Sequence, residues 1–173
     1  MGLTEEGFET GARRRRRAAR TGPETGSMDL GRGPVAVDTA AFIYFIEEDE
    51  RFLPVVRPLF AEADRGARLL VTSAITLLEV LVVPFRTGDR QLAGRYEALI
   101  TRSRGVRVVD VTRGQLRAAA QLRAATGVKT PDALQLAAAL GTGCRTFVTN
   151  DRRLPPIPGL RVLQLSEWGQ SRL

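Results

Sequence analysis

Short apolar runs alternate along the chain with longer segments in which apolar residues recur at helical spacing. The short runs, such as "PVAV" and "TFVT", are typical of buried strands, and glycines separate many of the elements. The pattern predicts strands near residues 34–38, 68–72, 105–109, 145–149 and 160–164, and helices near 39–47, 52–65, 74–86, 89–102, 113–126 and 131–141.

This alternation predicts an α/β domain built on a mostly parallel sheet. In such a sheet, ligands bind beyond the carboxyl ends of the strands, at the point where the strand order reverses. Asp38 ends the first predicted strand, and Asp151 follows the fourth, in "TFVTNDRRL". Both carboxylates are therefore expected at the same edge of the sheet.

Residues 1–33 differ in character, because they contain the run "RRRRR" and little apolar content. We expect them to form a disordered, Arg-rich extension ahead of a single folded domain at 34–173. No apolar segment follows the arginines as it would in a secretory signal, and no apolar run is long enough to span a bilayer. The expected location is the cytoplasm, with no membrane partner.

The amino-acid composition excludes several kinds of catalytic and metal-binding site. The chain of 173 residues carries 26 basic and 19 acidic residues, a formal net charge of +7, which favours polyanionic partners such as nucleic acid. Histidine is absent and Cys144 is the single cysteine. Disulfide frameworks, histidine triads and zinc sites built on histidine are thereby excluded. Any catalysis must use carboxylates, hydroxyls, arginine, lysine or a hard metal ion.

Asp38 and Glu79 stand out because each carboxylate lies in apolar surroundings. Asp38 follows "VAV" and is six residues from the nearest preceding base, Arg32, although burying an unpaired charge costs several kcal/mol. Glu79 lies within "SAITLLEVLVV", a segment apolar all round, so it is expected to be buried or to face a cleft. The alternatives for Glu79 are exposure to solvent or an ion pair with Arg86.

Each acidic residue also has a purely structural explanation. Asp132, in "KTPDALQ", falls in the first turn of a predicted helix capped by Thr130, with Pro131 at the first position, and the helix dipole alone stabilises an acid there. Asp38 can serve as a helix N-cap and Asp151 as a turn residue. Convergence of the four acids is what favours a site.

Four carboxylates at one edge repel one another, at about 4 kcal/mol for a pair ~4 Å apart at an effective dielectric near 20. Protons or hard cations relieve that repulsion. Oxygen ligands without histidine or cysteine favour Mg²⁺ or Mn²⁺, and Mg²⁺ commonly bridges to phosphate oxygens. The sequence thus indicates phosphoryl chemistry assisted by a divalent metal ion.

Four segments in order, "VAVDTAAFIYFIEED", "TSAITLLEVLVVPFRTGD", "GVKTPDALQLAAAL" and "CRTFVTNDRRL", resemble the PIN-domain nucleases, most closely the VapC-like toxins of type II toxin–antitoxin pairs. The resemblance covers about residues 34–165. It implies a PIN-like three-layer sandwich, with a five-stranded, mostly parallel sheet flanked by helices. It also implies an endoribonuclease that hydrolyses RNA phosphodiester bonds and depends on Mg²⁺ or Mn²⁺.

The resemblance assigns roles by motif position. Thr149 matches a hydroxyl that supports the site, and Asn150 matches a common neighbour, whereas Gln135 stands where many relatives carry histidine. The residues implied as catalytic and metal-binding acids are Asp38, Glu79, Asp132 and Asp151. Lys129, Arg152 and Arg153 are candidates for contacts to RNA phosphates, or are simply solvated surface charges.

Other functions remain open at this level. A housekeeping RNA-processing nuclease and a non-catalytic RNA- or protein-binding PIN module share the same pattern. A phosphatase with Asp38 as nucleophile is disfavoured, because that chemistry usually needs a second acid where Ala40 stands.

VapC-like proteins are generally homodimers whose antitoxin reaches into the acidic site, so the resemblance also implies both partners. Apolar stripes in 52–65 and 89–102 favour the dimer, unless these helices simply cover the sheet.

Overall fold

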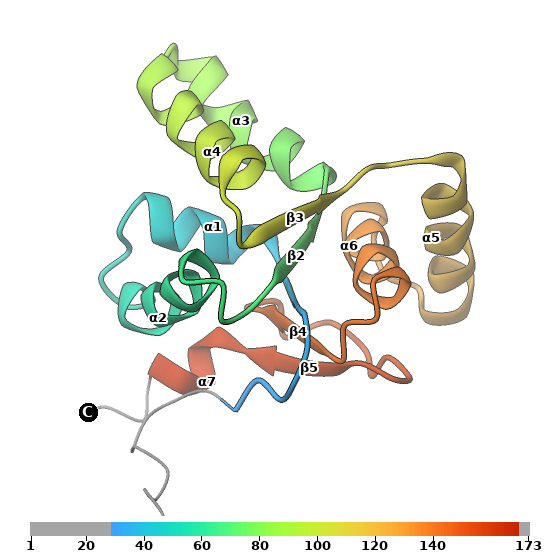
Figure 1. The fold of residues 1–173 in the computed structure, drawn as a ribbon. Helices are drawn as coiled ribbons and strands as arrows, with labels where there is room; N and C mark the ends of the chain where they lie inside the picture. Colours follow the sequence, from blue (N-terminus) through green and yellow to red (C-terminus); the bar gives the residue numbers. More distant parts are fainter. Residues whose placement is uncertain (1–28, 170–173) are drawn as a thin grey trace, which may run out of the picture.

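The computed structural model describes residues 29–169, which form an α/β domain around one sheet (Figure 1). The strands are β1 (Val35–Val37), β2 (Leu70–Ser73), β3 (Val106–Val109), β4 (Thr146–Thr149) and β5 (Arg161–Gln164). The helices are α1 (Thr39–Ile46), α2 (Leu53–Asp64), α3 (Ile75–Thr87), α4 (Arg90–Arg102), α5 (Arg113–Thr126), α6 (Thr130–Gly141) and α7 (Leu165–Gly169).

The sheet is parallel throughout, with the strand order β3-β2-β1-β4-β5. The predicted α/β class and the five strands are confirmed, with boundaries that differ by one or two residues; only the short α7 was not predicted. The order reverses between β1 and β4, which are adjacent at the centre. All strands end at one edge, here termed the carboxyl edge, and begin at the other, the amino edge.

The two faces of the sheet carry separate layers of helices because neighbouring strand residues point to opposite sides. Val35 and Val37 pack into a core with α1, α2 and α4, whereas Ala36 between them packs into a second core with α6 and part of α5. The same alternation divides Leu70 from Val71 in β2. Figure 1 shows α5 and α6 together on one side, with α1 and α2 on the other. The result is the three-layer sandwich.

The apolar stripes expected to form an interface are instead largely covered within the domain. In α2, Val56, Leu59 and Phe60 are buried, as are Tyr96 and Ile100 in α4, so both helices close over the sheet. The helix expected to be buried all round, α3, is instead partly exposed, with Thr76, Val80 and Pro84 buried. It leaves the carboxyl end of β2 and packs mainly on α4, which leaves one side open (Figure 1). Its exposed apolar residues are Leu78, Val82, Val83 and Phe85.

The folded domain begins earlier than residue 34. Leu30, expected in the extension, is only 5 % exposed, and its carbonyl oxygen accepts a 3.0 Å hydrogen bond from the Thr146 hydroxyl. Asp29 forms an ion pair with Arg161. The arginine run and the rest of 1–28 lie outside the described residues. Within 29–169, no helix has the length and apolar character needed to cross a membrane.

Gly105, directly before β3, provides a test of the packing between α2 and the sheet. A Cβ atom there would overlap the backbone carbonyl of Ala63 and lie 2.6 Å from the Ala63 Cβ. We expect Gly105→Ala to lower the free energy of unfolding by about 2–3 kcal/mol, measured by urea denaturation. The control, Gly94→Ala on the exposed surface of α4, meets nothing within 4 Å and should raise it by about 0.5–1 kcal/mol. Equal effects of the two changes would contradict the packing described.

Candidate active site

Four acidic residues come from four different elements at or near the carboxyl edge. Asp38 follows β1 and is the N-cap of α1, and Asp151 lies two residues beyond β4. Glu79 belongs to α3, and Asp132 to the first turn of α6. Thr130, expected to cap α6, is instead its first residue, because the helix begins one position earlier than predicted. Since β1 and β4 are adjacent, Asp38 and Asp151 flank the point where the strand order reverses.

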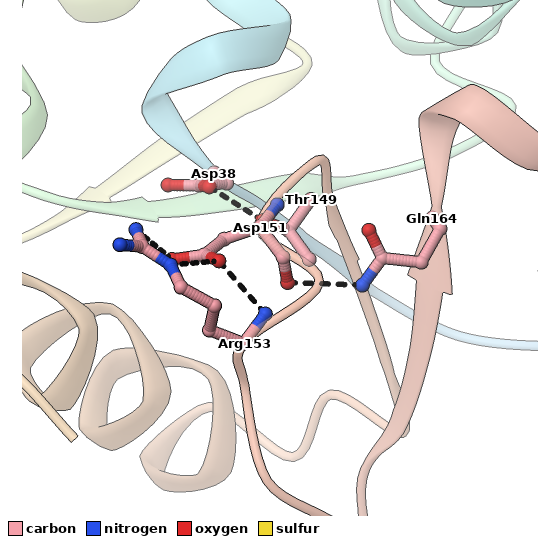
Figure 2. A network of polar contacts seen from close by, with 5 residues as sticks. All are labelled: Asp38, Thr149, Asp151, Arg153 and Gln164. Atoms are coloured by element: carbon pink, nitrogen blue, oxygen red, sulfur yellow. Dashed lines mark hydrogen bonds and ion pairs between the residues drawn. The ribbon is translucent and has the colours of Figure 1, made fainter.

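Thr149 connects these two acids. Its hydroxyl donates a 2.6 Å hydrogen bond to Oδ2 of Asp38 and accepts a 3.0 Å bond from the backbone N–H of Asp151 (Figure 2). The other oxygen of Asp38 accepts from the Thr39 N–H at 2.7 Å, which is the helix cap. Asp38 is thus held at both oxygens, so its capping role and its place in the acidic group coincide.

The loop after β4 is anchored on both sides. Asn150 donates to the Tyr44 hydroxyl at 3.0 Å and accepts from the Ser166 N–H at 3.2 Å, which joins α1 to α7. Gln164 at the end of β5 donates to the backbone carbonyl of Asp151 at 3.0 Å (Figure 2). The Asp151 carboxylate points away from the side on which Gln164 holds its backbone carbonyl (Figure 2).

Glu79 rests on a buried network of hydroxyl groups. Its Oε2 accepts a hydrogen bond from the Thr39 hydroxyl, which in turn lies 3.2 Å from the Thr76 hydroxyl. Gln135 of α6, 2 % exposed, donates to Thr76 at 2.6 Å and to Thr39 at 3.3 Å. Its Oε1 accepts from the Ser73 N–H at 3.0 Å. Among the described residues, Glu79 forms no ion pair with Arg86, and its side chain is half-buried.

The sequence pattern did not indicate that Thr39, Thr76 and Gln135 form one network. Two signals bear on it: Thr39 directly follows Asp38, and Gln135 lies one helical turn beyond Asp132 on the same face of α6. The contact between α3 and α6 that completes the network required the tertiary structure.

The pKa values show that the carboxylates influence one another. Burial is the main cause that raises the pKa of Asp38, and the charges of Asp132 and Asp151 raise it further. Burial likewise raises the pKa of Glu79, followed by the charges of Asp38 and Asp132. The pKa of Asp132 is raised by burial and then by Asp151. The four acids thus form one electrostatically coupled group.

Asp151 differs from the other three acids. Arg153 donates to both of its carboxylate oxygens, at 2.9 Å from Nε and 2.8 Å from a terminal nitrogen (Figure 2). This guanidinium holds the pKa of Asp151 below its usual range. A cavity of about 220 Å³ beside the pair is lined by Asp132, Asp151, Arg153 and Lys129 among others. Asp38 and Glu79 do not line it.

The donor set fits a hard divalent cation in its chemistry, because carboxylate oxygens are the ligands that Mg²⁺ and Mn²⁺ prefer. Burial is the main cause of the raised pKa values of Asp38, Glu79 and Asp132, and the charges of neighbouring acids, which a cation would offset, add to it. In their present positions, however, no three acidic side chains within 29–169 converge closely enough to hold an ion. Arg153 occupies the oxygens of Asp151, so a cation there competes with this guanidinium.

The three candidate phosphate-binding residues lie beside the acids but differ in their contacts. Arg152 donates to the Ser166 hydroxyl at 3.1 Å, and Arg153 is paired with Asp151. Lys129 is exposed and lines the small cavity.

Asp38 gives a prediction about stability and pH. The pKa of Asp38 is higher in the folded than in the unfolded protein, so as pH rises the folded state keeps its proton to a higher pH. The free energy of unfolding therefore falls as pH rises from the unfolded pKa through the folded pKa. The loss persists at neutral pH. Without divalent ions, Asp38→Asn should therefore melt a few degrees above the wild type at pH 7.5, with the difference shrinking towards pH 4.

The control is Asp110→Asn, an exposed acid that directly follows β3 at the same edge. Its melting temperature should follow the wild type at every pH. A destabilised Asp38→Asn at pH 7.5 would show that the two hydrogen bonds to the carboxylate outweigh its desolvation.

Comparison with known proteins agrees with this architecture. The family model for the PIN domain matches residues 35–160. No curated protein sequence matches the chain significantly. Among solved structures, VapBC2 from Rickettsia felis, bound to a DNA fragment of its promoter, superposes with a TM-score of 0.59 at 17 % identity, covering 75 % of this chain and 97 % of that one.

Two further structures have the same fold. VapC20 of Mycobacterium tuberculosis, a toxin that cleaves the sarcin-ricin loop, has a TM-score of 0.56 at 19 % identity and covers 69 % of this chain and 91 % of its own. DNA-bound VapBC of Salmonella typhimurium has a TM-score of 0.53 at 23 % identity, and the match covers 78 % of this chain and 99 % of that one. At these identities the likeness is one of fold. The family match spans most of the chain, from β1 to just before β5, and this protein accordingly belongs to the PIN domain family.

Proposed function

We propose that the protein is a divalent-metal-dependent endoribonuclease that hydrolyses RNA phosphodiester bonds. The observation that carries the proposal is the placement of four carboxylates, from the end of β1, α3, the first turn of α6 and the loop after β4, near the strand-order reversal. The charges of neighbouring acids contribute to the raised pKa values of Asp38, Glu79 and Asp132. A structural set of acids has no reason to concentrate negative charge where parallel sheets bind ligands. Membership of the PIN domain family supports the same reaction class.

In this mechanism Asp38, Glu79, Asp132 and Asp151 would hold Mg²⁺ or Mn²⁺, with Arg153 displaced from the carboxylate of Asp151. When bound, such an ion lowers the pKa of water and offsets negative charge on the phosphoryl group. Thr149 and Thr39 keep Asp38 and Glu79 in place through their hydroxyl hydrogen bonds. One carboxylate accepts the proton of the attacking water. Lys129 and Arg153 line the small cavity beside Asp132 and Asp151, and in this proposal they would contact phosphate oxygens.

A role as a toxin is the more specific form of the proposal. The matched Rickettsia and Salmonella structures are toxin–antitoxin complexes bound to DNA, and the matched Mycobacterium protein is a toxin that cleaves the sarcin-ricin loop. We propose that this chain likewise pairs with an inhibitory protein. A guanidinium from that partner would suit the acidic group, as the bidentate pair of Arg153 and Asp151 illustrates within the chain. A housekeeping RNA-processing nuclease and a non-catalytic PIN module are the alternatives.

The proposal predicts that Ala substitution of Asp38, Glu79, Asp132 or Asp151 lowers Mg²⁺-dependent RNA cleavage at least about 100-fold, because a ligand to the ion is lost. A gel assay with labelled RNA measures cleavage, and circular dichroism checks the fold. Asp110→Ala is the matched control and should retain full activity. Full activity in any of the four variants would remove that residue from the site, and no cleavage by the wild type would favour a binding module.

We also propose that the protein forms homodimers, now on different grounds from the sequence, since the stripes on α2 and α4 are largely covered. The exposed apolar side chains of α3 offer an alternative surface, with Phe85 64 % exposed and Leu78 63 % exposed. Exposed apolar patches on small domains frequently mark interfaces.

Light scattering should give twice the chain mass at micromolar concentration for the wild type, and the monomer mass for Leu78→Glu/Phe85→Glu. The control Val111→Glu/Leu116→Glu changes two exposed apolar residues by α5 and should remain dimeric. A monomeric wild type contradicts the dimer.

Adding the inhibitory partner, once identified from a neighbouring gene, should abolish RNA cleavage, and persistent cleavage at saturation would contradict inhibition.

A further inference from the structure

The amino edge of the sheet has the opposite charge from the carboxyl edge. An arginine stands shortly before each of three adjacent strands: Arg32 before β1, Arg68 before β2 and Arg104 before β3. The strands lie in parallel register, with Val35 opposite Leu70 and Leu70 opposite Val106, so the segments that precede them are neighbours. Residues far apart in the sequence thereby form one basic group.

These three arginines line a cavity of about 610 Å³, here termed the amino-edge cavity. Its lining contains no acidic residue. The space beside two of its glycines is empty, since a Cβ atom at Gly33 or at Gly66 would meet nothing within 4 Å. Both glycines have positive φ, a conformation that a larger residue adopts only with strain. Side chains are therefore absent from these two positions of the loops that border the cavity.

The arginines differ in how firmly they are held. Arg68 donates to Glu62 at 2.7 Å and to the Gly31 carbonyl oxygen at 3.1 Å, so it is fixed and partly neutralised. The side chains of Arg32 and Arg104 are exposed and have neither a hydrogen bond nor an ion pair to any residue of 29–169. Their guanidinium donors face water and remain available to a ligand with several acceptor oxygens.

We propose that the amino-edge cavity is an RNA-binding exosite, where the phosphate backbone of single-stranded RNA binds away from the site of cleavage. The inference rests on the proposed ribonuclease function for the identity of the polyanion. Adjacent strands are about 4.8 Å apart, so the charges are distributed in a row, and a row suits a linear polyanion better than one compact phosphate. A flexible single strand can follow a positively charged groove between loops with its phosphate backbone, so single-stranded RNA is the expected ligand.

One neighbouring residue adds a further positive charge at this edge. Arg145 directly precedes β4 at the same edge, is exposed and has no ion pair within the described chain. By contrast, Arg161 is paired with Asp29 and contributes less charge.

The test removes the charges of Arg32 and Arg104. Arg68 is left unchanged, because its hydrogen bonds to Glu62 and Gly31 also hold the loops together. In EDTA, where no metal-dependent cleavage occurs, fluorescence anisotropy measures binding of an unstructured RNA of about 20 nucleotides, long enough to reach both edges. For Arg32→Gln/Arg104→Gln we expect the slope of log K against log salt to decrease in magnitude by about 1.4, since each lost contact to a single strand accounts for about 0.7. Affinity should fall about tenfold.

The matched control is Arg86→Gln/Arg90→Gln, which removes two exposed arginines from the tip of the α3–α4 hairpin and should leave the slope unchanged. An unchanged slope in the amino-edge variant would overturn the exosite. The exosite would also be overturned if the amino-edge variant lost affinity only for duplex DNA or only for inorganic polyphosphate, each measured in competition with the RNA.

Cleavage assays separate this inference from the proposed function. With Mg²⁺, the amino-edge variant should cleave a short RNA that covers only the acidic site at the wild-type rate, and a long RNA with a raised KM and unchanged kcat. If the wild type cleaves RNA but the variant binds it normally, the exosite alone is wrong. If binding falls as expected and no protein cleaves, the exosite stands and the nuclease function is wrong.

Discussion

The two hydrogen bonds to Asp38, from the Thr39 N–H and the Thr149 hydroxyl, hold the centre of the carboxyl edge together. They begin α1 directly at the end of β1 and join the end of β1 to the end of β4, where the strand order reverses. They also keep a carboxylate in a position where burial raises its pKa. Because the hydroxyl of Thr149 simultaneously accepts from the Asp151 N–H, the placement of the second acid depends on the first.

Around this centre, the remaining acids are arranged by helices that belong to different layers. Glu79 is reached through Thr39 and the Thr76 hydroxyl, and Gln135 of α6 joins that network from the opposite side of the sheet. Such a buried network is stable because its donors and acceptors find partners, whereas a half-satisfied network would be costly. It supports Glu79 without contributing charge of its own, so the negative charge remains concentrated on the four acids.

The parallel sheet also separates charge between its edges. Asp38, Asp110 and Asp151 follow β1, β3 and β4 at one end, and Arg32, Arg68 and Arg104 precede β1, β2 and β3 at the other. A parallel sheet makes this arrangement possible, because every strand presents its first residues on the same side. The proposed active site and the proposed exosite are the two consequences of that geometry for one negatively charged polymer.

The sequence alone determined the α/β class, the order of the elements and the two acids at strand ends, because hydrophobic periodicity and glycine positions depend on neighbouring residues. It also indicated Glu79 and Asp132 once their motifs were compared with a known family. Tertiary structure decided what depends on partners distant in the chain. The stripes of α2 and α4 are covered because the sheet lies beneath them, and α3 is exposed because it packs chiefly on α4. The hydroxyl network under Glu79 and the arginine row formed only when parallel pairing brought residues 30 to 100 positions apart into contact, which no local pattern encodes.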